Sequence, residues 1–132
     1  MTKIVFDTSA VLKILIRPNR VMMLHKIRQP HKLITNKYIL DEVERILHQK
    51  FGQTVQRAKA ITRSYTKNCH IIGRVNYTET NPPLRDPLDN PIANLCIDEL
   101  ADILITDDKD LLLAKIPGTK IITFKEFIAL NK

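Results

Sequence analysis

The sequence predicts an α/β fold, with one domain over residues 1–132 and a parallel central sheet flanked by helices in an α/β/α arrangement. Strand-like and helix-like segments alternate along the chain, which is typical of parallel strands joined by crossover helices. The chain has 132 residues and 44% hydrophobic content, which allows one buried core. We therefore expect a single compact domain without internal repeats.

The first third of the chain predicts two strands and two helices. Residues 3–6 are β-branched or aromatic and precede Asp7 in an Asp-Thr-Ser sequence typical of a helix cap. A Pro-Asn pair interrupts the next apolar segment, so we expect short helices at 12–16 and 20–28. A second strand is expected at 32–35.

The middle of the chain predicts two longer helices and a strand. Apolar residues keep helical spacing over 37–51, and Gly52 provides the stop. A basic helix is expected over 55–65 and a third strand at 69–72. Four of the seven prolines then fall within 78–91, which indicates a surface loop.

The last third predicts the remaining alternation of strands and helices. The expected order is a helix over 91–100, a strand at 102–106, a helical turn over 108–114, a strand at 120–122, and a final helix capped by Thr123 and running to Leu130.

Several protein classes are disfavoured by composition. No apolar run approaches the length of about 20 residues that a membrane helix needs, and the N-terminus does not resemble a secretory signal, so we expect a cytoplasmic protein. Cys69 and Cys96 lack metal-ligand spacing and lie among apolar neighbours, which favours buried reduced thiols. The four histidines have no evident acidic partner, and we assign them no catalytic role.

The net charge of +7 is unevenly distributed. The segment 13–74 holds 14 of the 21 Lys and Arg residues but only 3 of the 14 acids. An enzyme that binds a polyanion while collecting cations at one place would have this distribution. Ordinary surface solvation would produce it too, so charge alone gives nucleic-acid binding about even odds.

Acidic residues from three chain regions are expected at one edge of the sheet. Asp7 follows the first strand, Asp107 and Asp108 follow the fourth, and Asp89 lies near the start of the preceding helix. Ligands of open parallel sheets bind beyond the carboxyl ends of the strands, so these side chains should converge.

Each of these acids also has a structural alternative. Asp7, Asp89 and Asp108 could cap helices, and for Asp7 alone capping is favoured about two to one. Helical spacing does not separate Glu42 from Glu44, and either could form a surface salt bridge. The combination favours metal binding, because crowded carboxylates repel one another unless a cation neutralises them. An oxygen-only donor set indicates Mg²⁺ or Mn²⁺.

At this point the sequence resembles a known family. The segments VFDTSAVL, LDEVERIL, RDPLDNPIANLCIDELADILITDDKDLL and IITFKEFIAL are similar to a PIN domain over nearly the whole chain. The resemblance extends to the VapC-like branch described as toxin components of toxin–antitoxin systems.

The resemblance implies a metal-dependent endoribonuclease that hydrolyses RNA phosphodiester bonds with Mg²⁺ or Mn²⁺. It implies four metal ligands and catalytic residues, with four supporting residues around them. The ligands would be Asp7, Glu42, Asp89 and Asp108, and the supporting residues Thr8, Ser9, Thr106 and Asp107. The family usage favours Glu42 over Glu44. Asp107 replaces the usual glycine, which leaves open whether Asp107 or Asp108 faces the metal, and we favour Asp108.

The resemblance also implies partners, namely an RNA substrate, a small antitoxin protein and a second copy of the chain in a homodimer. A phosphatase or receiver domain would also gather acids at strand ends. Both fit poorly, because Ser9 stands where the phosphatase needs a second Asp, and Asp7 lacks the receiver's paired acid. A degenerate PIN domain that binds RNA or protein without cleavage remains the alternative.

Overall fold

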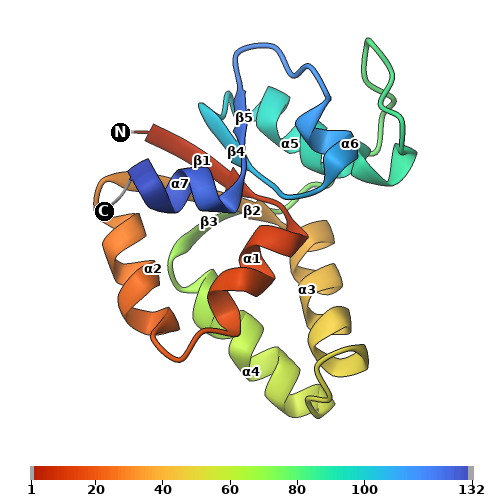
Figure 1. Ribbon diagram of the computed structural model, residues 1–132. Helices are drawn as coiled ribbons and strands as arrows, with labels where there is room; N and C mark the ends of the chain where they lie inside the picture. Colours follow the sequence, from red (N-terminus) through yellow and green to blue (C-terminus); the bar gives the residue numbers. More distant parts are fainter. Residues whose placement is uncertain (1, 131–132) are drawn as a thin grey trace.

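A parallel sheet of five strands forms the centre of the computed structural model, which describes residues 2–130. The strands are β1 (Thr2–Phe6), β2 (His31–Asn36), β3 (Cys69–Ile72), β4 (Ile103–Ile105) and β5 (Lys120–Ile122), in the spatial order β3-β2-β1-β4-β5. Every neighbouring pair is parallel. The predicted α/β fold with a parallel sheet is thus confirmed (Figure 1).

The helices lie where the hydrophobic periodicity predicts them. They are α1 (Thr8–Leu15), α2 (Arg20–Arg28), α3 (Lys37–Gln49), α4 (Val55–Thr66), α5 (Asn90–Asp98), α6 (Lys109–Leu112) and α7 (Phe124–Leu130). Helix α1 begins earlier than the predicted 12–16, because Asp7 caps it. A short 3₁₀ helix, η1 (Pro87–Asp89), lies within the predicted loop.

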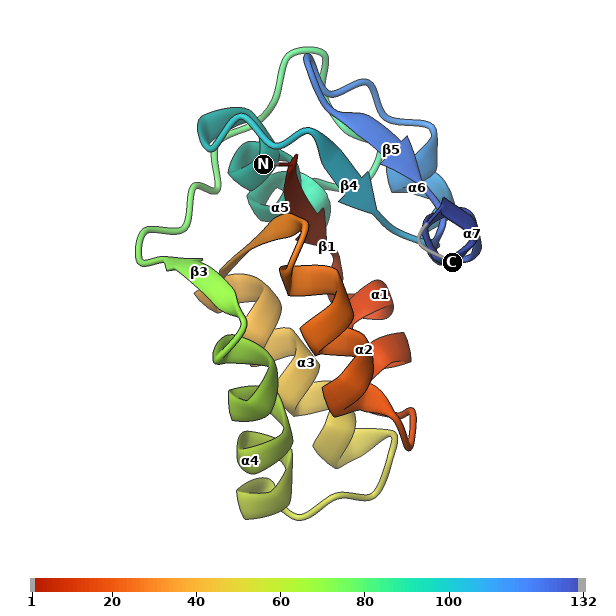
Figure 2. The ribbon, with the colours of Figure 1, turned by 90° about the vertical axis from the view of Figure 1, so that its left-hand side faces the viewer.

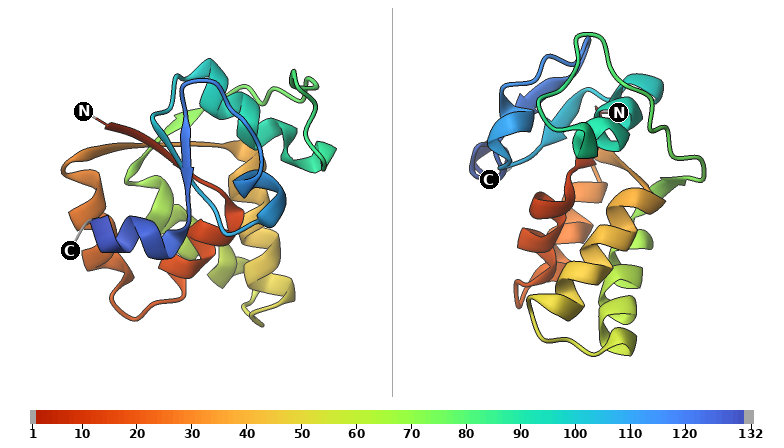
Figure 3. Two further views of the ribbon diagram at one scale, coloured as in Figure 1. Left: turned by 45° about the horizontal axis from the view of Figure 1, so that its top comes forward. Right: turned by 90° about the vertical axis from the view of Figure 1, so that its right-hand side faces the viewer.

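The helices are divided between the two faces of the sheet. Helices α1 to α4 lie together on one side and α5 lies on the other (Figure 2). Helix α7 returns to the side of α1 and α2 (Figure 3). There Phe127 meets the fully buried Phe6 edge to face, with ring centroids 5.4 Å apart, a contact worth about 1 kcal/mol beyond its burial.

The sheet order creates one topological switch point. Strand β1 pairs with β2 on one side and with β4 on the other, so the connections before and after this point run in opposite directions. The carboxyl ends of β1 and β4 lie side by side, because Phe6 pairs with Ile105. Asp7 and Thr106 are therefore the next residues along neighbouring strands, at the edge where such folds bind ligands.

Within residues 2–130, Cys96 is buried as expected, whereas Cys69 is only partly buried. Both cysteines are free, and burial raises the pKa of each thiol to about 12, so they stay protonated and unreactive near neutral pH. No helix in this part of the chain is long and apolar enough to cross a membrane.

Candidate active site

Asp7 is the buried centre of the site. Its side chain is only 3% exposed, and one oxygen accepts hydrogen bonds from the Ser9 hydroxyl at 2.8 Å and the Ala10 amide at 3.0 Å. Burial raises the pKa of Asp7, the nearby Asp108 charge raises it further, and the hydrogen bonds oppose both effects. Asp7 therefore caps α1 and also belongs to the acidic cluster, so its capping role is compatible with the predicted role as a metal ligand.

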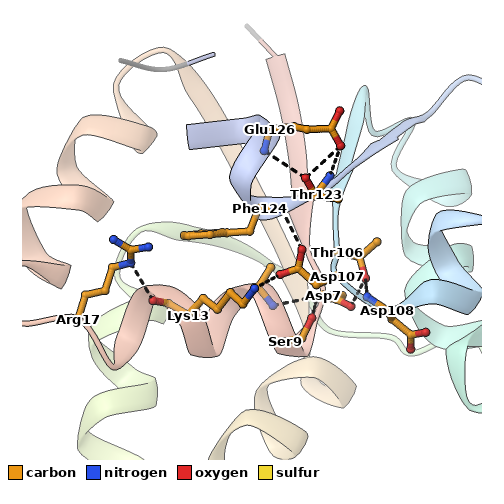
Figure 4. Close-up of polar contacts among 11 residues, drawn as sticks. Asp7, Ser9, Lys13, Arg17, Thr106, Asp107, Asp108, Thr123, Phe124 and Glu126 are labelled. Atoms are coloured by element: carbon orange, nitrogen blue, oxygen red, sulfur yellow. Dashed lines mark hydrogen bonds and ion pairs between the residues drawn. The ribbon is translucent and has the colours of Figure 1, made fainter. Parts of the chain in front are cut away.

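Thr106 connects Asp7 to Asp108. Its hydroxyl donates to the second Asp7 oxygen and accepts from the Asp108 amide at 3.0 Å (Figure 4). Ser9 and Thr106 thus hold Asp7 as the sequence interpretation expects. Thr8 does not, because its hydroxyl oxygen is buried and has no hydrogen-bond partner among residues 2–130.

Asp89 is the least compensated carboxylate of the cluster. The residue is 8% exposed, and its side chain accepts no capping hydrogen bond at the start of α5. Burial is the largest cause that raises its pKa to about 7, followed by the charges of Asp108, Asp86, Asp7 and Asp110. The usual pKa of an aspartate is 3.8, so a pKa of about 7 means that no nearby cation among residues 2–130 compensates the ionised form of Asp89.

Asp107 and Asp108 point to different partners. Asp108 caps α6 by accepting the Asp110 amide at 2.9 Å, and its charge acts on both Asp7 and Asp89. Asp107 instead pairs with the Lys13 ammonium and accepts the Phe124 amide at 3.3 Å (Figure 4). Of the two, Asp108 is thus the one that faces the other acids.

Glu42 lies at the margin of the cluster. It lines a groove with Tyr38 and Tyr77, and after burial its charge is the largest cause that raises the Tyr38 pKa. Asp89 also raises the pKa of Tyr38, whose hydroxyl donates to the Leu88 carbonyl at 2.7 Å. The charges of Glu42 and Asp89 therefore both act on Tyr38, whereas the charges that raise the pKa of Asp89 come from aspartates and not from Glu42.

Sequence reasoning missed two residues that position the cluster. Asn36 caps α3 by accepting the Ile39 amide at 3.0 Å, and its side-chain amide donates to the Pro91 carbonyl at 3.3 Å. This links the helix that carries Glu42 to the helix that starts beside Asp89. Tyr38 is the second, and in both cases the only sequence signal is their place at the start of a predicted helix after a strand.

The donor set fits a hard divalent cation. The converging side chains offer only carboxylate oxygens, and burial together with repulsion from the other acids makes Asp89 hard to ionise without a counterion. Across residues 2–130, no three His, Cys, Asp or Glu side chains are arranged to hold one ion together. That arrangement is not required for Mg²⁺, which commonly uses one or two carboxylates and keeps several waters. Asp7, Asp89 and Asp108 are the residues that fit this role.

Comparison with family models identifies a PIN domain over residues 3–110. This range includes all four predicted ligands. No curated protein sequence matches the chain.

Solved structures share the fold at low sequence identity. PAE2754 from Pyrobaculum aerophilum matches with a TM-score of 0.66 and 14% identity, covering 98% of this chain and 95% of that chain. VapBC2 from Rickettsia felis, bound to a DNA fragment from their promoter, matches with a TM-score of 0.65 and 12% identity, covering 92% of this chain and 98% of that one. The PIN domain of RRP44 from T. brucei has a TM-score of 0.50 and 14% identity, with coverage of 97% and 79%.

Proposed function

Since the chain belongs to the PIN-domain family, we propose that it is a metal-dependent endoribonuclease that hydrolyses RNA phosphodiester bonds. The family has a nuclease-type fold, and its members generally use divalent metal ions. One observation supports the proposal above all: the buried Asp89 carboxylate, with a pKa of about 7, lies among acids at the switch point of the sheet. A bound cation would stabilise the ionised form of such a buried carboxylate and offset the repulsion from its acidic neighbours.

The proposed roles follow from the contacts of each residue. Asp7, Asp89 and Asp108 would hold Mg²⁺ or Mn²⁺, with Glu42 at the margin as a further ligand. A bound divalent ion lowers the pKa of its water and stabilises the charge of the displacement at phosphorus. Ser9 and Thr106 fix the orientation of Asp7 through their hydroxyl groups. Because the metal would activate the water, the proposed mechanism needs no histidine as a general base.

The charge distribution supports a polyanionic substrate. Asp7, Asp107 and Asp108 follow strand ends, while segment 13–74 carries 14 of the 21 Lys and Arg residues. Basic surface around an acidic metal site would hold the nucleic-acid backbone while the metal acts on one phosphate. RNA is the substrate we propose.

We also propose a toxin–antitoxin context. The structural neighbour from Rickettsia felis is a VapBC2 complex, and the fold is shared over 92% of this chain. On this proposal the protein is a cytoplasmic toxin with a small antitoxin partner, and a homodimer is its expected assembly. Coexpression with the product of an adjacent small gene, followed by size-exclusion chromatography, would test both partners.

A PIN domain that binds RNA without cleavage is the second candidate. It is favoured by the lack, within residues 2–130, of three side chains arranged around one ion, and by Asp107 in place of the usual glycine. The two functions differ in one measurable property, because only the nuclease depends on the ionised Asp89 carboxylate together with a metal.

The deciding experiment is cleavage of end-labelled single-stranded RNA by purified protein, with Mg²⁺, Mn²⁺ or EDTA. We expect metal-dependent cutting by the wild type and a loss of at least a hundredfold in Asp89→Asn, with Glu44→Gln as the matched control. Equal cutting by the wild type and Asp89→Asn would indicate a contaminating nuclease. RNA binding without cutting by any variant would favour the second candidate.

A further inference from the structure

A basic groove lies between α1 and α7, beside the acidic cluster. It has a volume of about 690 Å³, and three of the side chains that line it are cations: Lys13, Arg17 and Lys125. Among the residues that the structure describes, no acidic side chain lines it. Phe124 contributes an apolar wall, and its ring is almost completely buried. The rest of the lining is also apolar, formed by Ile16, Pro18, Ile128 and Ala129, so the groove is an apolar surface that carries three cations.

Arg17 is held in place but has no counterion. Its guanidinium lies over the Phe124 ring, 5.2 Å from the centroid, and its Nε donates to the Lys13 carbonyl at 3.2 Å. Within residues 2–130 no carboxylate forms an ion pair with it. Since a guanidinium carries five N–H donors, most of the hydrogen-bonding capacity of Arg17 stays available.

Lys13 pairs with an acid that follows the neighbouring strand β4. Its ammonium pairs with Asp107 and lies 5.9 Å from the Phe124 ring centroid (Figure 4). Lys13 lies in the last turn of α1, Arg17 follows the end of that helix, and Asp107 neutralises only one of these two cations. The Lys13 side chain is 49% exposed and that of Asp107 27%, so solvent weakens the pair and another anion can replace Asp107.

We propose that this groove binds one backbone phosphate of the RNA strand through Lys13 and Arg17, and that Asp107 occupies Lys13 until the phosphate displaces it. The proposal rests on the proposed function, because it gives the RNA a path to the carboxylates. A phosphodiester matches the groove, since the Arg17 guanidinium and the Lys13 ammonium both lie over the Phe124 ring and can bind two of the phosphate oxygens. The next residue after Asp107 is Asp108, so a phosphate bound here lies on the strand that passes the metal site.

The test is RNA affinity in a cleavage-disabled background. Fluorescence anisotropy with labelled single-stranded RNA, in EDTA, would compare Asp89→Asn alone with the same protein carrying Arg17→Gln or Asp107→Asn. We expect Arg17→Gln to weaken binding about tenfold and to reduce the slope of log affinity against log salt by about 0.7. We expect Asp107→Asn to strengthen binding severalfold, because it releases Lys13 and the Asn oxygen can still accept the Phe124 amide.

A double-mutant cycle separates this effect from general charge. Removing any acid near RNA improves affinity somewhat, and Asp86→Asn measures that contribution. The gain from Asp107→Asn should exceed the gain from Asp86→Asn, and it should disappear in a Lys13→Gln background. Lys59→Gln, an exposed cation on α4, should weaken binding much less than Arg17→Gln. Thermal unfolding of every variant would establish that it is folded.

The outcomes distinguish the groove from the nuclease. The proposed displacement of Asp107 by a phosphate is wrong if Asp107→Asn increases RNA affinity no more than Asp86→Asn does. It is also wrong if Asp107→Asn increases the affinity equally in the Lys13→Gln background. If Arg17→Gln binds RNA as tightly as its parent, the groove is not an RNA site, and an acidic protein would be the occupant to test next. Metal-dependent cleavage by the wild type would uphold the nuclease in either case. Groove effects on binding without any cleavage would uphold the groove and overturn the nuclease.

Discussion

The Thr106 hydroxyl donates to Asp7 across the ends of two neighbouring strands, although the residues are 99 positions apart in the chain. The same oxygen accepts the Asp108 amide, so a single buried hydroxyl sets the relation between two of the predicted metal ligands. Because β1 and β4 pair directly, this link depends on the sheet as well as on the loop after β4.

Thr106→Val should therefore destabilise the protein and disturb the site. The substitution keeps the shape of the side chain but leaves the Asp7 oxygen and the Asp108 amide without their partner, which costs about 1–3 kcal/mol. Urea unfolding would measure the loss, and the cleavage assay should show lower activity. Thr106→Ser, which retains the hydroxyl, should recover most of both. Equal stability of the Val and Ser variants would contradict this role for the hydroxyl.

The raised pKa of Asp89 predicts how stability depends on pH. The folded protein binds this proton with a pKa of about 7, and the usual unfolded value is 3.8. The folded state therefore holds the proton more tightly, so in metal-free protein this group makes stability fall as pH rises from about 4 to 7. Above pH 7 its destabilisation is complete, on the order of 2 kcal/mol after allowance for solvent screening.

Asp89→Asn should remove this contribution. The variant should match the wild type near pH 4 and become more stable than it as the pH rises to 7, when both are unfolded with urea in EDTA. The exposed Asp41→Asn controls for the loss of one negative charge on the surface. A stability difference between wild type and Asp89→Asn that does not change from pH 4 to 8 would contradict the assigned environment of Asp89.

A divalent ion should reverse the destabilisation at neutral and alkaline pH. A cation that binds only the folded state at ten times its dissociation constant adds about 1.4 kcal/mol, which corresponds to a rise in Tm of roughly 3–6 °C for a chain of this size. Thermal scans at pH 8 with Mn²⁺ or Mg²⁺ should show this shift for the wild type. Asp89→Asn should show little of it, and a full shift in that variant would place the ion elsewhere.

The strands and helices could be predicted from local sequence because their causes are local. Short β-branched segments become strands in the interior of a parallel sheet, and Gly52, at φ +67°, follows the end of α3 as its position predicts. The remaining differences are at helix ends, where Asp7 starts α1 early and η1 forms within the proline-rich loop. Asp7 and Asp108 follow the ends of neighbouring parallel strands, and Asp89 starts the helix that leads into β4, so their convergence could be predicted too.

What the sequence could not predict depends on contacts between distant residues. Asp107 and Asp108 are adjacent and chemically identical, and their directions are decided by Lys13, which is 94 positions away, and by the Phe124 amide. The link from Asn36 to Pro91 likewise joins segments that only the fold brings together. The choice of Glu42 over Glu44 rests on the family resemblance, and the catalytic role of Glu42 stays a prediction.

The Asn36 link should matter for both stability and activity. Asn36→Ala removes the cap of α3 and the hydrogen bond to Pro91, at a combined cost of about 1–3 kcal/mol. Asn36→Asp retains an oxygen that can accept the Ile39 amide, but it cannot donate to the Pro91 carbonyl. We expect unfolding measurements to place the Asp variant between the wild type and the Ala variant. Wild-type stability in Asn36→Ala would mean that this link is unimportant.

Glu42 and Glu44 offer the sharpest test of the predicted ligand set, because they are two residues apart on one helix and both are half-buried. Glu42 shares a groove with Tyr38, which responds to the charges of both Glu42 and Asp89, whereas Glu44 is outside that groove. Glu42→Gln should reduce metal-dependent cleavage at least tenfold and raise the metal concentration needed for half-maximal activity. Glu44→Gln should change neither by more than about twofold. If the two variants lose activity equally, the loss would reflect the charge of α3 as a whole, and the metal ligands would be reduced to the three aspartates.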